Sequence, residues 1–164
     1  YKRQIYNSDE PTSGKDPVNM GVGIHIGQLV LGTIGRELRM ETTVISDTVN
    51  ASARLENLNK TYKTNVLISG AVRDELSPDI QSFCRLIDRT QVKGKVEFLD
   101  VYEVYLTDDE ALAEAKSKSK KVLTSIVDSY YLGDIKAAKK LLGELEDDTK
   151  KDTVISFWKT RLKT

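Results

Sequence analysis

Apolar residues alternate with small or polar ones near the start of the chain, over residues 18–26. The alternating positions are Val18, Met20, Val22, Ile24 and Ile26. A period of two is typical of a strand with one buried face, so the pattern predicts a half-buried strand. Two further β-rich runs follow, at residues 28–35 and around 42–45, and glycines at their ends suit tight turns.

From Asp47 onward the apolar period becomes helical. Ala51, Leu55, Leu58 and Tyr62 are spaced four, three and four residues apart, which places them on one stripe of a helix. Ser46 or Asp47 suits the N-cap position. We therefore expect a helix that begins near residue 47 and ends before residue 64.

The remaining β-rich part alternates short elements. The sequence predicts a buried strand at 65–69, a brief helix at 70–76 capped by Ser69, and strands within 83–92 and 97–106. Lys93, Gly94 and Lys95 form the expected turn between the last two strands. Strands and helices in this order predict an α+β fold for residues 1–107.

Composition changes in residues 108–164, which we expect to form a second, small α-helical module. A charged, alanine-rich stretch predicts a helical or flexible connector. Three helical stripes follow, with Gly133 between the first two. This part resembles one degenerate tetratricopeptide hairpin, a unit that cannot bury its own apolar face. It is therefore expected to pack on the β-rich part or on a partner.

Charge and composition exclude several classes of function. The 25 basic and 25 acidic side chains cancel, so no broad cationic surface favours a nucleic acid as partner. No apolar run reaches the roughly 20 residues that span a bilayer, which predicts no membrane contact from this chain. The single cysteine, Cys84, excludes an internal disulfide. These features favour an intracellular, cytoplasmic domain whose anchoring in the full-length protein stays open.

Asn50 and Arg54 are the side chains most suited to chemistry. They lie four residues apart and therefore one turn apart on a face beside the apolar stripe. A guanidinium offers paired donors to phosphate, and an amide can orient a hydroxyl or a carbonyl. Taken alone, such a pair is more often an ordinary solvated helix face.

The order of the motifs changes that interpretation. The runs GVGIHIGQLVLGTIG, TTVISDTVNASARLE and TQVKGKVEFLDVYEV closely resemble the C-terminal half of the class III nucleotidyl cyclase catalytic domain. The resemblance covers roughly residues 18–106. It implies a ferredoxin-like cyclase fold that is partial here, lacking its N-terminal strands, and a head-to-tail homodimer with its active sites between subunits.

The resemblance also implies an activity, the conversion of ATP to 3′,5′-cyclic AMP and pyrophosphate. Asn50 matches the asparagine that positions the ribose, and Arg54 matches the arginine that stabilises charge on the α-phosphate. Thr43 matches a base-reading position that favours adenine, and the backbone of Val44 lies beside it. Lys93, or with less support Lys95, matches the contact to the terminal phosphates. Thr43 as an ordinary strand residue and Lys93 as a solvated turn lysine remain alternatives.

The chain departs from the family pattern at the metal site. The resemblance implies two Mg²⁺ or Mn²⁺ ions held by two aspartates on the first strands, and no matching motif occurs here. We therefore expect the ligands to lie upstream of this chain and the fragment alone to be inactive. A catalytically silent, cyclase-like dimerisation or regulatory module is the main alternative, and a guanylate cyclase is another.

Other conspicuous residues have structural interpretations. His25 lacks companion ligands in its strand, so we expect a structural role. Cys84 lies in an apolar strand and is expected to be a buried thiol. Trp158 and the tyrosines of the tail are expected to pack between helices.

Overall fold

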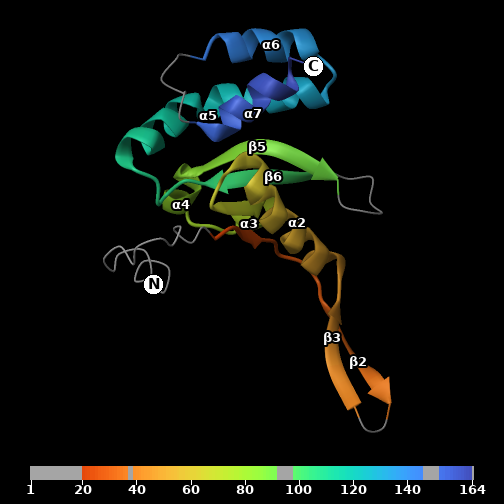
Figure 1. Cartoon of the computed structure of the whole chain (residues 1–164). Coiled ribbons are helices and arrows are strands. Elements are labelled where there is room, and N and C mark those ends of the chain that lie inside the picture. The colour runs from red at the N-terminus through yellow and green to blue at the C-terminus, as the bar shows by residue number, and fades with distance from the viewer. Residues whose placement is uncertain (1–19, 37–38, 92–97, 146–151, 164) are drawn as a thin grey trace, which may run out of the picture.

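The computed structural model describes residues 20–36, 39–91, 98–145 and 152–163, and for 30–36 and 39–45 it describes the backbone. It is a mixed α+β fold with a four-stranded sheet and helices (Figure 1). The predicted contacts Lys93 and Lys95 lie outside the described residues.

The main sheet has the strand order β1-β4-β6-β5. Its strands are β1 (Val22–Ile24), β4 (Val66–Ser69), β5 (Cys84–Gln91) and β6 (Phe98–Val104). β1 runs parallel to β4, and the other two pairs are antiparallel. The predicted strands at 65–69, 83–92 and 97–106 are thereby confirmed within the described residues.

A separate two-stranded hairpin extends away from this sheet (Figure 1). It pairs β2 (Val30–Arg36) with β3 (Arg39–Ile45) in antiparallel register, so that Thr43 lies opposite Gly32. The strand predicted around 42–45 is therefore longer than expected, because pairing with β2 continues along the whole hairpin.

Helix α2 (Asp47–Tyr62) confirms the predicted helix and its ends. The Ser46 hydroxyl accepts a hydrogen bond from the Thr48 backbone N–H at 3.0 Å, which satisfies one of the free donors of the first turn. Lys63 ends the helix in the left-handed conformation, with φ 54°. The stripe is buried as expected, except that Leu58 is half-buried.

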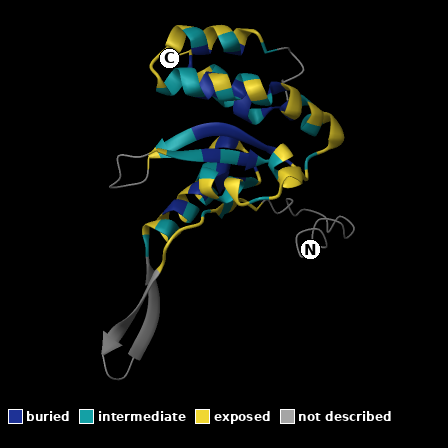
Figure 2. Cartoon of the chain, turned by 180° about the vertical axis from the view of Figure 1, so that it is seen from behind, coloured by how far each residue is buried: buried dark blue, intermediate teal, exposed yellow. Residues whose placement is uncertain are grey.

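In the first strand, the face that is buried is the opposite of the one expected. The period of two is present, but its apolar members are exposed, by 53% at Met20, 38% at Val22, 44% at Ile24 and 52% at Ile26. The alternate side, with Gly23, faces α2, whose backbone packs on it. Figure 2 shows exposed residues along this segment. The prediction assumed that the larger side chains face the core, whereas close helix packing selected the smaller ones.

Two short helices follow β4, and the sequence predicted one of them. Helix α3 (Gly70–Asp74) is capped by the Ser69 hydroxyl, which accepts from the Val72 N–H at 3.4 Å. Helix α4 (Pro78–Ser82) was not predicted, although proline at the first helical position is its signal.

The connector and the first helical stripe of the C-terminal part form one helix of 22 residues, α5 (Glu110–Tyr131). The flexible alternative for the connector was therefore wrong. Asp109 caps the helix by accepting from the Leu112 N–H, and Gly133, at φ 82°, makes the turn to α6 (Ile135–Gly143). The last helix of the described residues is α7 (Thr153–Arg161).

These C-terminal helices pack on the β-rich part, one of the two outcomes expected for them. Side chains of α2, the sheet, α5, α6 and α7 form one buried apolar cluster, and Figure 2 shows the buried residues gathered where sheet and helices meet. The division at residues 107/108 follows the change in composition, but hydrophobic burial crosses it.

A buried ion network joins the same parts. Arg85 on β5 is fully buried and pairs with Glu103 at 2.7 Å and with Asp152 at 2.6 Å. Lys116 of α5 reaches Glu103 at 2.6 Å and Asp108 at 2.5 Å. Apolar periodicity carries no signal for such a network, because charged residues within strands are ordinarily expected to face solvent.

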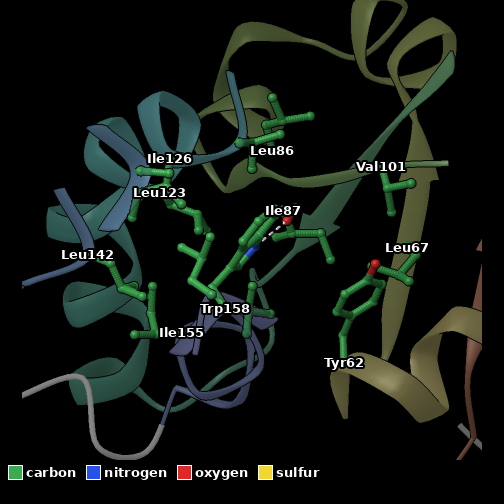
Figure 3. Close-up of a cluster of buried hydrophobic side chains, with 14 of the residues drawn as sticks. Tyr62, Leu67, Leu86, Ile87, Val101, Leu123, Ile126, Leu142, Ile155 and Trp158 are labelled. Atoms are coloured by element: carbon green, nitrogen blue, oxygen red, sulfur yellow. Dashed lines mark hydrogen bonds between the residues drawn. The ribbon is translucent and has the colours of Figure 1, made fainter. Parts of the chain in front are cut away.

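Trp158 of α7 is fully buried in the apolar cluster (Figure 3). Its indole Nε1 donates to the backbone carbonyl of Ile87 at 2.8 Å. Ile87 lies at a break in the β5–β6 register, between Leu86 and Asp88, so the indole satisfies a carbonyl at an irregular point of the ladder. The expected packing role of Trp158 is confirmed.

We expect Trp158→Phe to lower the free energy of unfolding by about 1–3 kcal/mol beyond the lost contact area, because it leaves a buried carbonyl unpaired. Urea denaturation measures this loss. Tyr105→Phe is the control, since the carbonyl of Ser82 that it abandons still accepts from Lys120 at 3.1 Å. An equal loss in both variants would contradict the role assigned to the indole.

Candidate active site on helix α2

Asn50 and Arg54 lie on the exposed side of the first half of α2. Both side chains are exposed, whereas Ala51 and Leu55, one residue further along in each case, are buried. Since residues four apart are neighbours on a helix surface, the amide and the guanidinium share one solvent-facing stripe. That stripe is a surface from which a ligand can be contacted.

The C-terminal helices leave this stripe uncovered. They contact α2 at its far end, where the Tyr62 and Phe157 rings pack edge to face with centroids 4.8 Å apart. At the same end, the Thr153 hydroxyl donates to the Lys63 carbonyl at 3.5 Å. The tail therefore supports the C-terminal end of the helix while Asn50 and Arg54 stay open to solvent.

The N-terminal end of α2 is tied to the segment that follows β1. Ser46 Oγ and Thr48 Oγ1 both donate to the Gln28 carbonyl, at 2.7 and 2.8 Å. These serine and threonine hydroxyls hold the first turn, where Asn50 begins the exposed stripe. The Ser46 hydroxyl also caps the helix, as expected.

Thr43 and Val44 lie near the end of β3, which leads into α2 through Ser46. Their partners across the hairpin are Gly32 and Leu31. The backbone therefore joins the predicted base-reading segment directly to the helix of Asn50 and Arg54.

No group of three or more His, Cys, Asp or Glu side chains among the described residues is arranged to hold a metal ion. His25 Nδ1 lies 2.9 Å from the hydroxyl of Ser69, which links β1 to β4. The donors of the described residues therefore do not fit the two ions that the family resemblance implies.

Cys84 is a buried free thiol, as expected. Burial raises its thiol pKa, and its Sγ donates to the Ile80 carbonyl at 3.4 Å. A raised pKa disfavours the reactive thiolate, so this residue offers no nucleophile to the site.

Asn59 is a residue that the sequence analysis did not single out. It is 3% exposed, and its amide Nδ2 donates to the Val22 carbonyl at 3.0 Å. A signal was present, because Asn59 follows Leu55 by four residues and so belongs to the buried stripe. A polar side chain at such a position requires a hydrogen-bond partner.

Residues 3–107 match the adenylate and guanylate cyclase catalytic domain family, and because this is well over half of the chain, the chain belongs to that family. It is 43% identical over 93 residues to an adenylate cyclase of Anabaena cylindrica, which covers 56% of this chain and 18% of that protein. Adenylate cyclase 1 of Rhizobium meliloti (strain 1021) is 40% identical over 101 residues, covering 62% of this chain and 15% of the relative.

The chain therefore spans less than a fifth of the length of these two relatives. A bacterial light-regulated adenylyl cyclase of known structure superposes with a TM-score of 0.44 and 27% sequence identity, over 51% of this chain and 23% of that one. The family assignment rests on the sequence matches. Among the described residues, no helix has the length and apolar character needed to cross a bilayer.

Proposed function

We propose that this chain contains the C-terminal half of the catalytic domain of a class III adenylate cyclase, which converts ATP to 3′,5′-cyclic AMP and pyrophosphate. The observation that carries the proposal is the exposed pair on α2, Asn50 and Arg54, at the positions where the family resemblance expects its amide and guanidinium. Adenylate cyclases with about 40% identity over this region support the choice of class.

In the proposed reaction the ribose 3′-oxygen attacks the α-phosphorus of ATP. A bond forms from that oxygen to phosphorus, the bond from phosphorus to the bridging oxygen breaks, and pyrophosphate leaves with the electron pair. The 3′-hydroxyl releases its proton to solvent water in the process. Negative charge builds up on the phosphoryl oxygens and on the leaving group, so catalysis depends on positioning and on preorganised positive charge.

Asn50 and Arg54 have different roles in the proposed reaction. The Asn50 amide holds the ribose so that its 3′-oxygen lies in line with the bond that breaks. The Arg54 guanidinium donates to the phosphoryl oxygens as their charge grows, and a guanidinium matches the geometry of phosphate. A position on a packed helix rather than a loop supports both roles, because less reorganisation is then needed during the reaction.

Substrate recognition is assigned to the neighbouring segments. We propose that Thr43 and the backbone of Val44 read the adenine, and that Lys93 or Lys95 contacts the terminal phosphates. Support comes from β3, which ends one residue before the N-cap of α2. Two Mg²⁺ or Mn²⁺ ions, held by residues outside this chain, would neutralise the triphosphate.

We further propose that the complete enzyme works as a head-to-tail homodimer. The exposed apolar row at Met20, Val22, Ile24 and Ile26 supports a partner, because contiguous exposed apolar surface is typical of interfaces.

Helices α5 and α6 are proposed to derive from a tetratricopeptide-like hairpin. The single cysteine and absence of disulfide-forming pairs favour an intracellular location.

The test is an assay of cyclic nucleotide formation by the full-length gene product, with ATP and GTP in parallel and Mg²⁺ or Mn²⁺ present. We expect cyclic AMP from ATP, with a higher kcat/KM than for GTP. A preference for GTP would indicate a guanylate cyclase. If a folded dimer forms neither cyclic AMP nor cyclic GMP, the silent regulatory module is favoured.

A further inference from the structure

The middle of helix α2 lies directly against strand β1. A Cβ atom added to Gly23 would lie 2.2 Å from the Glu56 backbone nitrogen and 2.5 Å from the Ser52 carbonyl oxygen. Both are backbone atoms, which cannot move aside without moving the helix. Gly23 therefore sets how closely the helix approaches the sheet.

Both ends of the helix are held on the same side by hydrogen bonds. At the first turn, Thr48 Oγ1 donates to the Gln28 carbonyl at 2.8 Å. In the last turn, Asn59 Nδ2 donates to the Val22 carbonyl at 3.0 Å, while Asn59 Oδ1 accepts from Thr64 Oγ1 at 3.0 Å. We call Gly23, Thr48 and Asn59 the helix seat.

The helix seat lies opposite the candidate active site. At about 100° per residue, Thr48, Ser52 and Asn59 fall on one face of α2. Asn50 and Arg54 fall on the other side of the helix and are exposed. Any shift or rotation of α2 on the seat therefore displaces the amide and the guanidinium together.

We propose that Gly23, Thr48 and Asn59 are positioning residues for the cyclisation, acting through the placement of Asn50 and Arg54. The inference rests on the proposed function above. Misplacing a reacting group by about 1 Å can lower a rate by roughly 100-fold, whereas ground-state binding spread over the whole nucleotide changes less. The helix seat is thus expected to control kcat more than KM.

Gly23→Ala in the full-length gene product is the direct test. Restoring ordinary contact requires α2 to move by roughly 1 Å from β1. We expect kcat to fall about 100-fold while KM for ATP changes by less than about threefold. Crystal structures of wild type and variant should show the displacement of α2 relative to β4.

Gly70→Ala is the matched control, because its Cβ would meet nothing closer than Asp100 Cβ at 3.4 Å, an ordinary contact. We expect it to keep the wild-type kcat. If Gly23→Ala also keeps kcat within about threefold of this control, the inference is wrong. A fall in kcat that is matched by an equal rise in KM for ATP would overturn it as well, because the two changes together indicate a general structural defect.

Thr48 supplies a second test that holds if Gly23→Ala does not fold. Because the Ser46 hydroxyl donates to the same Gln28 carbonyl, the test is made in a Ser46→Ala background. There Thr48→Val removes the remaining side-chain hydrogen bond to Gln28 at nearly constant volume, and we expect kcat to fall about tenfold relative to Ser46→Ala alone. Thr48→Ser keeps the hydroxyl and should restore most of the rate. Equal kcat values for Thr48→Val and Thr48→Ser would show that the Thr48 hydroxyl does not position α2, and the inference would be wrong. A folded wild type that forms no cyclic nucleotide would instead overturn the proposed function, and this inference with it.

Discussion

Arg54→Ala is expected to reduce the kcat of the full-length cyclase by on the order of 10²–10³, with little change in KM for ATP. The guanidinium is exposed on α2, so its removal leaves the fold intact. Its proposed contact strengthens as charge builds up on the α-phosphate, so the loss falls on the transition state rather than on binding. Steady-state kinetics at saturating metal measures both constants.

Two further variants make this prediction specific. Arg54→Lys keeps the charge but loses the paired donors of the guanidinium, so it should recover only part of the rate. Lys60→Ala removes an exposed cation from the last turn of the same helix and should leave kcat unchanged. A rise in KM equal to the fall in kcat would remove Arg54 from its proposed role.

Arg85→Met is expected to lower the free energy of unfolding by about 3–5 kcal/mol, because it removes one partner of a buried ion pair. Arg85 is fully buried and donates to Asp152 through two nitrogens, at 2.6 and 2.9 Å. Methionine fills a similar volume, so most of the loss comes from buried carboxylates left without a partner. Urea denaturation of the chain measures it.

Arg89→Met is the matched control on the same strand. Arg89 also binds two carboxylates, Asp100 and Asp128, but all three side chains are partly exposed, by 24%, 38% and 46%. Exposed ion pairs contribute about 0–1 kcal/mol, so this variant should lose little stability. Similar losses in the two variants would mean that burial does not determine the effect.

The pH dependence of the Arg85→Met effect has a definite sign. Burial alone raises the pKa of Asp152, but its hydrogen bonds and proximity to Arg85 lower the pKa overall. In the wild type, the lowered pKa of Asp152 contributes stability at pH values above the ordinary pKa of an aspartate, and this stability is lost as the pH falls through the folded-state pKa. In Arg85→Met the contribution of Arg85 is gone and burial favours the neutral carboxyl, so protonation of Asp152 removes the cost of its unpaired charge. The difference in unfolding free energy between wild type and Arg85→Met should therefore narrow between pH 7 and about pH 4.

Elements with a strong local period could be predicted from the sequence. Helix α2 begins and ends where the spacing of Leu55 and Tyr62 and the cap at Ser46 indicate, because a helix is specified by residues within one or two turns. The exposure of Asn50 and Arg54 followed from the same stripe. The family resemblance then identified which exposed residues to examine.

Features that depend on distant parts of the chain could not be predicted in this way. The alternation at Val22 and Ile24 does not say which face a helix will cover, and α2 packed on the glycine side instead. Arg85 has the appearance of an ordinary strand cation, yet its partner Asp152 lies 67 residues further along. Such contacts join residues that no local period relates.

Local pattern thus established the strands, the main helices and the exposed pair on α2, since these depend on neighbours along the chain. Folding in three dimensions settled which face of β1 is covered, the union of the C-terminal helices with the sheet in one core, and the burial of the ion network. The physical reason is that burial depends on what packs against a surface, and the packing elements come from distant parts of the chain.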